Sequence, residues 1–136
     1  MSSLLANNSS ENKQKKDQNI SMIGKRVIVT GPTSGFGKEI AIELAALGAE
    51  LVLACRDLER GERTADEIKQ RTGAKNCAVM HVDTSSQKSI NEFSLQFRLK
   101  YSHLDVLVNN AGINRPKQSL SQVLFLKFRA PVTILP

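Results

Sequence analysis

The chain has 136 residues, of which 40% are apolar and 24% are charged, and these are ordinary values for one modest globular domain. It has no tryptophan and few other aromatic residues, so we expect an aliphatic core. The formal net charge of +6 is concentrated at one end, because residues 115–136 carry four basic side chains and no acidic one. The rest of the chain is near neutral, which excludes a basic nucleic-acid-binding face as the explanation of the high pI.

Residues 1–23 are rich in Ser, Asn, Gln and Lys, and they predict a disordered polar arm. The apolar run Leu4-Leu5-Ala6 is too short for a signal-peptide core or a membrane span, so we predict no transmembrane segment. Cys55 and Cys77 lie in apolar runs, which favours buried reduced thiols and a cytoplasmic location. The sequence leaves a disulfide between them open.

Apolar periodicity alternates between strand and helix along the body of the chain. Strands are predicted at 25–30, 50–55, 77–82 and 106–108, and helices at 35–47, at 58–71 and after Thr84-Ser85-Ser86. The apolar positions that mark the helices are Ile40, Leu44 and Leu47, then Leu58, Ala65 and Ile68 facing inward, then Ile90, Phe93, Phe97 and Tyr101. This order predicts an α/β fold: a doubly wound parallel sheet with strand order 3-2-1-4, the first two helices on one face and the third on the other.

A glycine-rich turn, Thr30-Gly31-Pro32-Thr33-Ser34-Gly35-Phe36-Gly37, joins the first strand to the first helix. Strand, glycine turn and helix N-terminus together favour a diphosphate, because the turn offers bare N–H groups and the helix adds a partial positive charge. Gly31 permits the tight turn, Gly35 keeps side chains away from a pyrophosphate, and Gly37 permits close helix packing. The P-loop spacing does not fit, and Thr33 occupies the second glycine position of G-x-G-x-x-G. From the glycines alone, the alternative of a turn that binds no ligand is also open.

The end of the second predicted strand is the other informative place. Arg56 is the first residue after it, where a guanidinium can bind the 2′-phosphate of NADP. Asp57 precedes the second helix, and helix capping is its expected role. This favours NADP over NAD, although Arg56 taken alone is also explained as a solvated loop charge.

Four motifs together resemble the short-chain dehydrogenase/reductase family: Thr30–Gly37, Cys55-Arg56-Asp57, His81-Val82-Asp83 and Asn109-Asn110-Ala111-Gly112. They lie in the family's order over residues 24–114, and Ala54–Gly61 looks most like the retinol dehydrogenase branch. The resemblance implies the N-terminal half of a Rossmann-type, NADP-binding domain. It assigns Ser34, Gly35, Phe36 and Gly37 to the pyrophosphate and Arg56 to the 2′-phosphate. It also assigns Asp83 to the adenine amino group, with Thr84 beside it, and Asn110, Ala111 and Gly112 to the adenosine ribose side.

The family's catalytic residues do not follow in this sequence. The family needs a Ser and a Tyr-x-x-x-Lys pair for proton exchange with the substrate oxygen. The only tyrosine is Tyr101, on the third predicted helix, and Asp105 stands where the Lys belongs. We therefore expect a chain truncated after the fourth strand, with 115–136 as a divergent basic-apolar tail produced by splicing, a shifted frame or an imperfect gene model. A membrane-surface segment and a tail that packs back on the sheet are the alternatives.

Two functions follow as hypotheses. The first is an NAD(P)-dependent oxidoreductase that transfers hydride between the cofactor and an alcohol or carbonyl, with a retinoid or lipid-like substrate, this chain carrying the cofactor-binding half. The second is a catalytically silent dinucleotide-binding or regulatory isoform, or a non-functional fragment. Without the helices that follow, the fourth strand is expected to be an exposed apolar edge, which favours aggregation or pairing with a full-length homologue.

Overall fold

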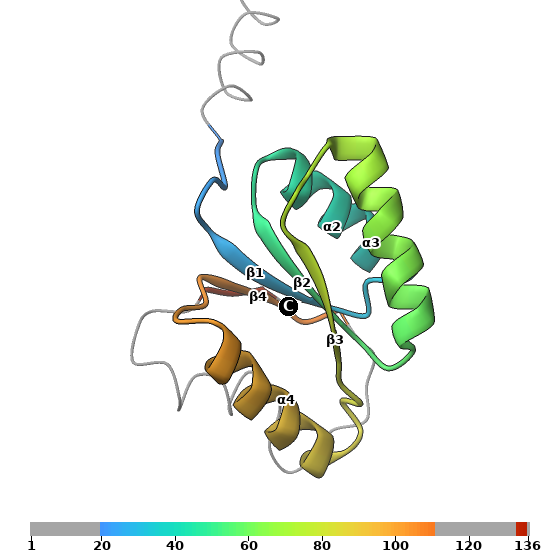
Figure 1. The fold of residues 1–136 in the computed structure, drawn as a ribbon, viewed down its shortest axis with the longest axis vertical. Helices are drawn as coiled ribbons and strands as arrows, with labels where there is room; N and C mark the ends of the chain where they lie inside the picture. The colour runs from blue at the N-terminus through green and yellow to red at the C-terminus, as the bar shows by residue number, and fades with distance from the viewer. Residues whose placement is uncertain (1–19, 111–132, 136) are drawn as a thin grey trace, which may run out of the picture.

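The computed structural model describes residues 20–110 and 133–135, and its centre is a parallel sheet (Figure 1). The strands are β1 (Arg26–Thr30), β2 (Glu50–Cys55), β3 (Cys77–His81), β4 (Val106–Val108) and β5 (Thr133–Leu135). The helices are α2 (Gly35–Ala46), α3 (Leu58–Thr72) and α4 (Gln87–Lys100). The strand order is β3-β2-β1-β4-β5, so the predicted order 3-2-1-4 is confirmed and extended by one strand.

The central strands are buried on both faces, as expected for a parallel sheet between two helical layers. In β1 every residue after Arg26 is buried, and in β2 every residue after Glu50 is buried. Ile28 of β1 lies opposite Val52 of β2 on one side and Leu107 of β4 on the other. The continuous apolar runs of the sequence therefore mark the middle of the sheet.

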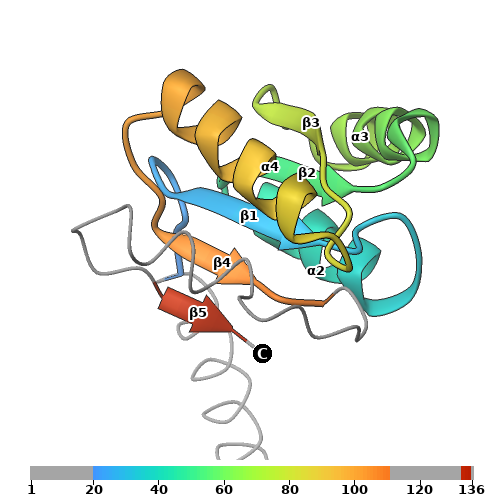
Figure 2. The same ribbon diagram turned by 90° about the horizontal axis from the view of Figure 1, so that it is seen from below.

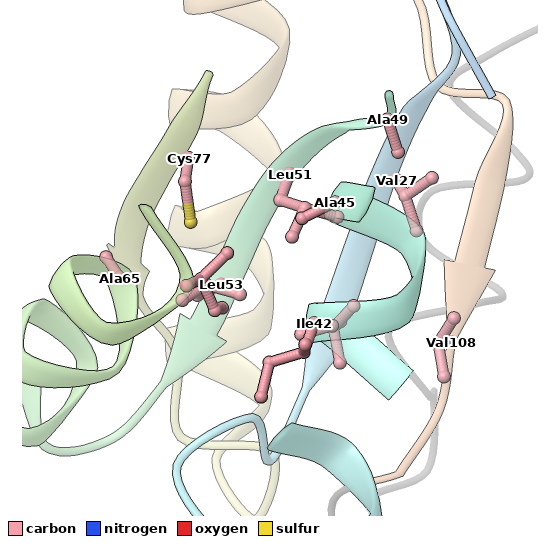
Figure 3. Close-up of a cluster of buried hydrophobic side chains, with 12 residues drawn as sticks. Val27, Ile42, Ala45, Ala49, Leu51, Leu53, Ala65, Cys77 and Val108 are labelled. Atoms are coloured by element: carbon pink, nitrogen blue, oxygen red, sulfur yellow. The ribbon is translucent and has the colours of Figure 1, made fainter. Parts of the chain in front are cut away.

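The helices cover the two faces unequally, as predicted. Within residues 20–110, helices α2 and α3 pack on one face and α4 alone packs on the other (Figures 1 and 2). On the first face Val27, Leu51 and Leu53 meet Ile42 and other small apolar side chains of α2 and α3 (Figure 3). The second face is covered by three side chains of α4, and these are Ile90, Phe93 and Phe97.

The inner stripe of α3 differs in part from the prediction, and the most buried residues of α2 are not the apolar positions that marked this helix in the sequence. On α2 the buried residues are Gly37, Ala41, Ile42 and Ala45, whereas Ile40, Leu44 and Leu47 are only half-buried. On α3, Ala65 and Ile68 are buried as predicted, but Leu58 is 47% exposed. Leu58 begins α3 at the carboxyl edge of the sheet, where less of the sheet lies beneath it. Small residues take the inner stripe of α2 because they allow this helix to lie close to the strands.

The prediction that β4 is an exposed edge is wrong. Backbone pairing places β5 beside β4 in parallel, with Val106 opposite Thr133 and Val108 opposite Leu135 (Figure 2). The pairing agrees with the alternative in which part of 115–136 packs back on the sheet. The reason for expecting a full-length homologue at β4 is thereby removed, because the ladder positions of β4 are filled on both sides by β1 and β5.

Both cysteines are free and buried, so the open alternative of a disulfide is excluded. Tyr101 is half-buried at the end of α4, where its ring packs against Phe97 and lies under the guanidinium of Arg26. No helix within residues 20–110 is both long enough and apolar enough to span a membrane.

Candidate functional site

A cleft of about 460 Å³ opens at the carboxyl ends of β1, β2 and β3. Ligands of open α/β sheets bind at this edge, where the loops after the strands converge. The cleft is lined by Gly31, Thr33, Ala54, Cys55, Arg56, Asp57, Arg60, Val82, Asp83, Thr84 and Ser85. Three loops that are far apart in sequence thus meet around one open space.

The glycine turn adopts backbone conformations that require glycine. Gly31 and Gly35 have φ angles of 61° and 58°, in the left-handed region that other residues avoid. A Cβ built on Gly35 would meet nothing within 4 Å, so the outer side of the turn is open. Ser34, Gly35 and Phe36 are exposed there, and the Phe36 side chain is 84% exposed.

Gly37 lies on the inner side of the same turn. A Cβ at this position would clash with the carbonyl oxygen of Gly31 and with the side-chain amide of Asn110. The Asn110 amide donates to Gly31 O at 3.1 Å, and the Asn110 backbone N–H donates to Thr30 Oγ1 at 2.9 Å. The end of β4 therefore braces the glycine turn, and Gly37 leaves the room for this bracing.

The N-terminus of α2 has no side-chain cap. Ser34 is its N-cap residue but makes no capping hydrogen bond, and the first turn contains no acidic residue. In contrast, Asp57 accepts from Arg60 N at the start of α3, and Ser86 accepts from Ser89 N at the start of α4. The first N–H groups of α2 thus lack the side-chain acceptor that the other two described helices have. They point outward from the glycine turn and are suited to an anion.

Asp83 is held in a fixed orientation at the end of the third loop. Its Oδ1 accepts from the Ser85 backbone N–H at 3.0 Å and from Ser85 Oγ at 2.6 Å. Its own backbone N–H donates to Ser89 Oγ at 2.8 Å. The bonds from Ser85 lower the pKa of Asp83, and the nearby charge of Arg56 lowers it further. Asp83 is therefore a carboxylate at neutral pH, with Oδ2 left to accept a hydrogen bond in the cleft.

The structure brings some of the predicted site residues together and separates others. Gly31, Arg56, Asp83 and Thr84 line the cleft, while Ser34, Gly35 and Phe36 lie on the exposed turn beside it. Gly37 and Asn110 support the turn from behind, and Ala111 and Gly112 lie outside the described residues. Asp57 caps α3, as predicted.

Sequence reasoning missed Thr33, Arg60 and Ser85, which also line the cleft. The signal for Arg60 was available: it lies in the first turn of a helix that follows a strand, and helical side chains lean toward the N-terminus. The cleft thus combines two guanidinium groups and a fixed carboxylate with the uncapped N-terminus of α2 beside it, a set that suits a phosphorylated nucleotide. Within the described residues, no group of three His, Cys, Asp or Glu side chains is arranged to hold a metal ion.

Comparison with known proteins adds a family. The family model for short chain dehydrogenases matches residues 25–128. Human retinol dehydrogenase 11 is 48% identical over 94 residues, which cover 69% of this chain and 30% of that protein. Human retinol dehydrogenase 13 is 44% identical over 92 residues, which cover 68% of this chain and 28% of that protein.

Solved structures give the same result. The Pseudomonas aeruginosa RhlG/NADP active-site complex has a TM-score of 0.63 and 31% identity, covering 69% of this chain and 37% of that one. Menthone neomenthol reductase from Mentha piperita has a TM-score of 0.62 and 31% identity, covering 66% of this chain and 32% of that one. The chain spans about 30% of the length of the retinol dehydrogenases that it matches. The family match, which covers most of the residues and the whole described cleft, shows that the chain belongs to the short-chain dehydrogenase family.

Proposed function

We propose that this chain binds a nicotinamide dinucleotide, with NADP preferred over NAD, as the cofactor-binding half of an oxidoreductase. The observation that carries the proposal is the uncapped N-terminus of α2 behind the open side of Gly35. A pyrophosphate placed there accepts hydrogen bonds from the first N–H groups of α2, which have no side-chain acceptor in Ser34. The solved structure of the RhlG complex with NADP, which shares this fold, supports the choice of ligand.

Each site residue has a role in this proposal. Ser34, Gly35, Phe36 and Gly37 form the pyrophosphate turn, and Arg56 binds the 2′-phosphate. Asp83 accepts from the adenine amino group through the oxygen that Ser85 leaves free, and Thr84 lies beside it. Asn110, Ala111 and Gly112 border the adenosine ribose, with Asn110 also fixing the turn.

The reaction that we propose for the whole enzyme is hydride transfer between NADP(H) and an alcohol or carbonyl. The likeness to retinol dehydrogenases favours a retinoid or lipid-like substrate. The bound dinucleotide supplies the hydride donor or acceptor, and the residues of this chain bind and orient it. A cytoplasmic location stays a prediction.

A dinucleotide-binding chain without catalysis is the second candidate, and the position of Tyr101 favours it. Tyr101 is the only tyrosine of the sequence. It contacts Arg26 at the amino end of β1, whereas the cleft lies at the carboxyl ends of the strands. It therefore cannot exchange a proton with a substrate at this cleft. An assay of the purified chain with NADPH and retinal separates the two candidates: turnover supports the first, and cofactor binding without turnover supports the second.

Cofactor binding itself is tested by thermal-shift titration of the full chain with NADPH. A ligand that binds only the folded state stabilises it by about 2.7 kcal/mol at a hundredfold excess over its dissociation constant. Gly35→Ala should abolish this shift, because a methyl group would stand where the pyrophosphate approaches. Gly24→Ala is the matched control: Gly24 also has a left-handed backbone, with a φ of 77° and open space around it, but lies outside the cleft. No shift with the unmodified chain, or an equal loss in both variants, contradicts the proposal.

A further inference from the structure

We infer that Arg60 is a second 2′-phosphate ligand and that it determines, together with Arg56, the preference for NADP over NAD. This inference rests on the proposed function and deepens it at the same cleft. Arg60 and Arg56 both line the cleft, from the first turn of α3 and from the loop before it.

The position of Arg60 at the start of α3 supports this role. Asp57 Oδ1 accepts from the Arg60 backbone N–H at 3.1 Å, so the capping bond of α3 fixes the backbone from which the Arg60 side chain starts. Side chains of an α-helix lean toward its N-terminus, and the N-terminus of α3 faces the cleft. Arg60 is therefore placed to reach the same part of the cleft as Arg56, and both side chains line it.

The guanidinium groups of Arg56 and Arg60 have no ion-pair partner in the described part of the chain, and this supports the same role. On the remainder of α3, Arg63 pairs with Glu59, and Arg71 pairs with Glu67 and Glu39. Within residues 20–110, neither Arg56 nor Arg60 has an ion pair. A phosphate monoester carries close to two negative charges at neutral pH, and two free guanidinium groups match both its charge and its geometry.

The other charged side chains near the cleft have hydrogen-bond or ion-pair partners of their own. The carboxylates of Asp57 and Asp83 each accept from a local donor, Arg60 N and Ser85 respectively, and within residues 20–110 neither forms an ion pair with Arg56 or Arg60, although the charge of Arg56 acts on Asp83. Lys38 is the one basic residue of the glycine turn and the start of α2, and its ammonium pairs with Glu67 of α3. The second positive charge for a 2′-phosphate is therefore available from Arg60 and not from the turn.

The test measures the dissociation constants of NADPH and NADH by isothermal titration of the full chain. We expect Arg60→Ala to weaken NADPH binding by about tenfold or more, as for a lost charged hydrogen bond, and NADH binding by less than about twofold. Arg63→Ala is the matched control, because Arg63 lies one turn from the cleft lining and already pairs with Glu59. It should leave both constants unchanged.

A second variant guards against a folding effect. Arg60→Lys keeps the charge but loses the planar fork, so it should retain part of the NADPH preference, with the melting temperature of each variant measured alongside. Tight NADPH binding that Arg60→Ala does not change overturns this inference and leaves the proposed function standing. Equal weakening of NADPH and NADH also overturns it. An unmodified chain that binds neither dinucleotide overturns the proposed function, and this inference with it.

Discussion

At the scale of the residue, one missing methyl group decides whether the glycine turn can form. The hydrogen at Gly37 faces the carbonyl of Gly31 and the amide of Asn110, and these groups belong to the turn and to the end of β4. A helix normally gains from alanine in place of glycine, by up to about 1 kcal/mol. Here the close approach of a backbone atom outweighs that gain, because a backbone carbonyl cannot rotate away.

We therefore expect Gly37→Ala to lower the free energy of unfolding by about 1–3 kcal/mol. Urea denaturation of the purified chain measures it. Gly61→Ala is the matched comparison, since its Cβ would meet only side-chain atoms, Cys55 Sγ at 2.5 Å and Val79 Cγ1 at 2.7 Å. Side chains can shift, so the loss at Gly61 should be smaller. An equal or larger loss at Gly61 would show that the bracing by Asn110 is not the limiting contact.

The buried thiols give a prediction about pH. Burial raises the pKa of Cys77 from 9.0 to about 11, and it also raises the pKa of Cys55. Because the folded state keeps the Cys77 proton where the unfolded state loses it, the free energy of unfolding should fall as the pH rises from 9 toward 11. Below pH 9 this contribution is fully present.

At pH 8 the raised pKa leaves roughly a hundredfold less thiolate at Cys77 than in the unfolded chain. A thiol-reactive disulfide reagent should therefore react slowly with the folded chain and rapidly in denaturant, with Cys77→Ala identifying the site. Rapid reaction of Cys77 in the folded chain would contradict the burial that the structure gives it.

At the scale of the element, the three described helices begin in two different ways. Helices α3 and α4 are capped by their own side chains, which stabilises them whether or not a ligand is present. The N-terminus of α2 has no such side-chain bond. Of these three helix starts, only that of α2 leaves its first N–H groups without a side-chain acceptor, which is the arrangement that our proposed function uses.

This contrast predicts the effect of removing a hydroxyl. Ser86→Ala should lower the free energy of unfolding by about 1 kcal/mol, because Ser86 Oγ accepts the Ser89 N–H at 3.2 Å. Ser34→Ala should change it by only a few tenths of a kcal/mol without ligand, because no capping bond is lost. Chemical denaturation of the two variants measures both values. A Ser34→Ala loss as large as that of Ser86→Ala would show that Ser34 does cap α2.

At the scale of the whole molecule, the order of the sheet depends on its last strand. Residues Thr133–Leu135 pair with Val106–Val108 and move the free edge of the sheet from β4 to β5. An unpaired, apolar β4 would be a template for association with another chain. The short β5 thus covers the backbone of β4 and itself becomes the outer strand of the described sheet.

Replacement of Thr133–Leu135 by Gly-Ser-Gly keeps the chain length and removes the strand preference. We expect this variant to self-associate as its concentration rises, because β4 is then exposed, and to lose amide protection at Val106–Val108. Light scattering and hydrogen exchange measure the two effects. A variant that stays monomeric with unchanged protection would show that β5 contributes nothing to the sheet.

The fold class, the order of the first four strands and the glycine turn were all predictable from the amino-acid sequence. These features depend on neighbours in the chain: apolar runs of strand length, helical periodicity, and glycines at fixed spacing. The capping role of Asp57 was predictable for the same reason, whereas the sequence favoured reduced cysteines and left the disulfide open until the fold placed them.

Features that depend on contacts between residues far apart in the sequence became visible only in the folded structure. The fold places β5 against β4, and parallel pairing of this kind leaves no local signal in the sequence. It exposed Leu58, which helical periodicity had placed inside, because the helix begins at the edge of the sheet. It also placed Arg60 and Arg56 along the same cleft, with no ion pair to either within residues 20–110, since spacing along a helix does not show which neighbours neutralise a charge.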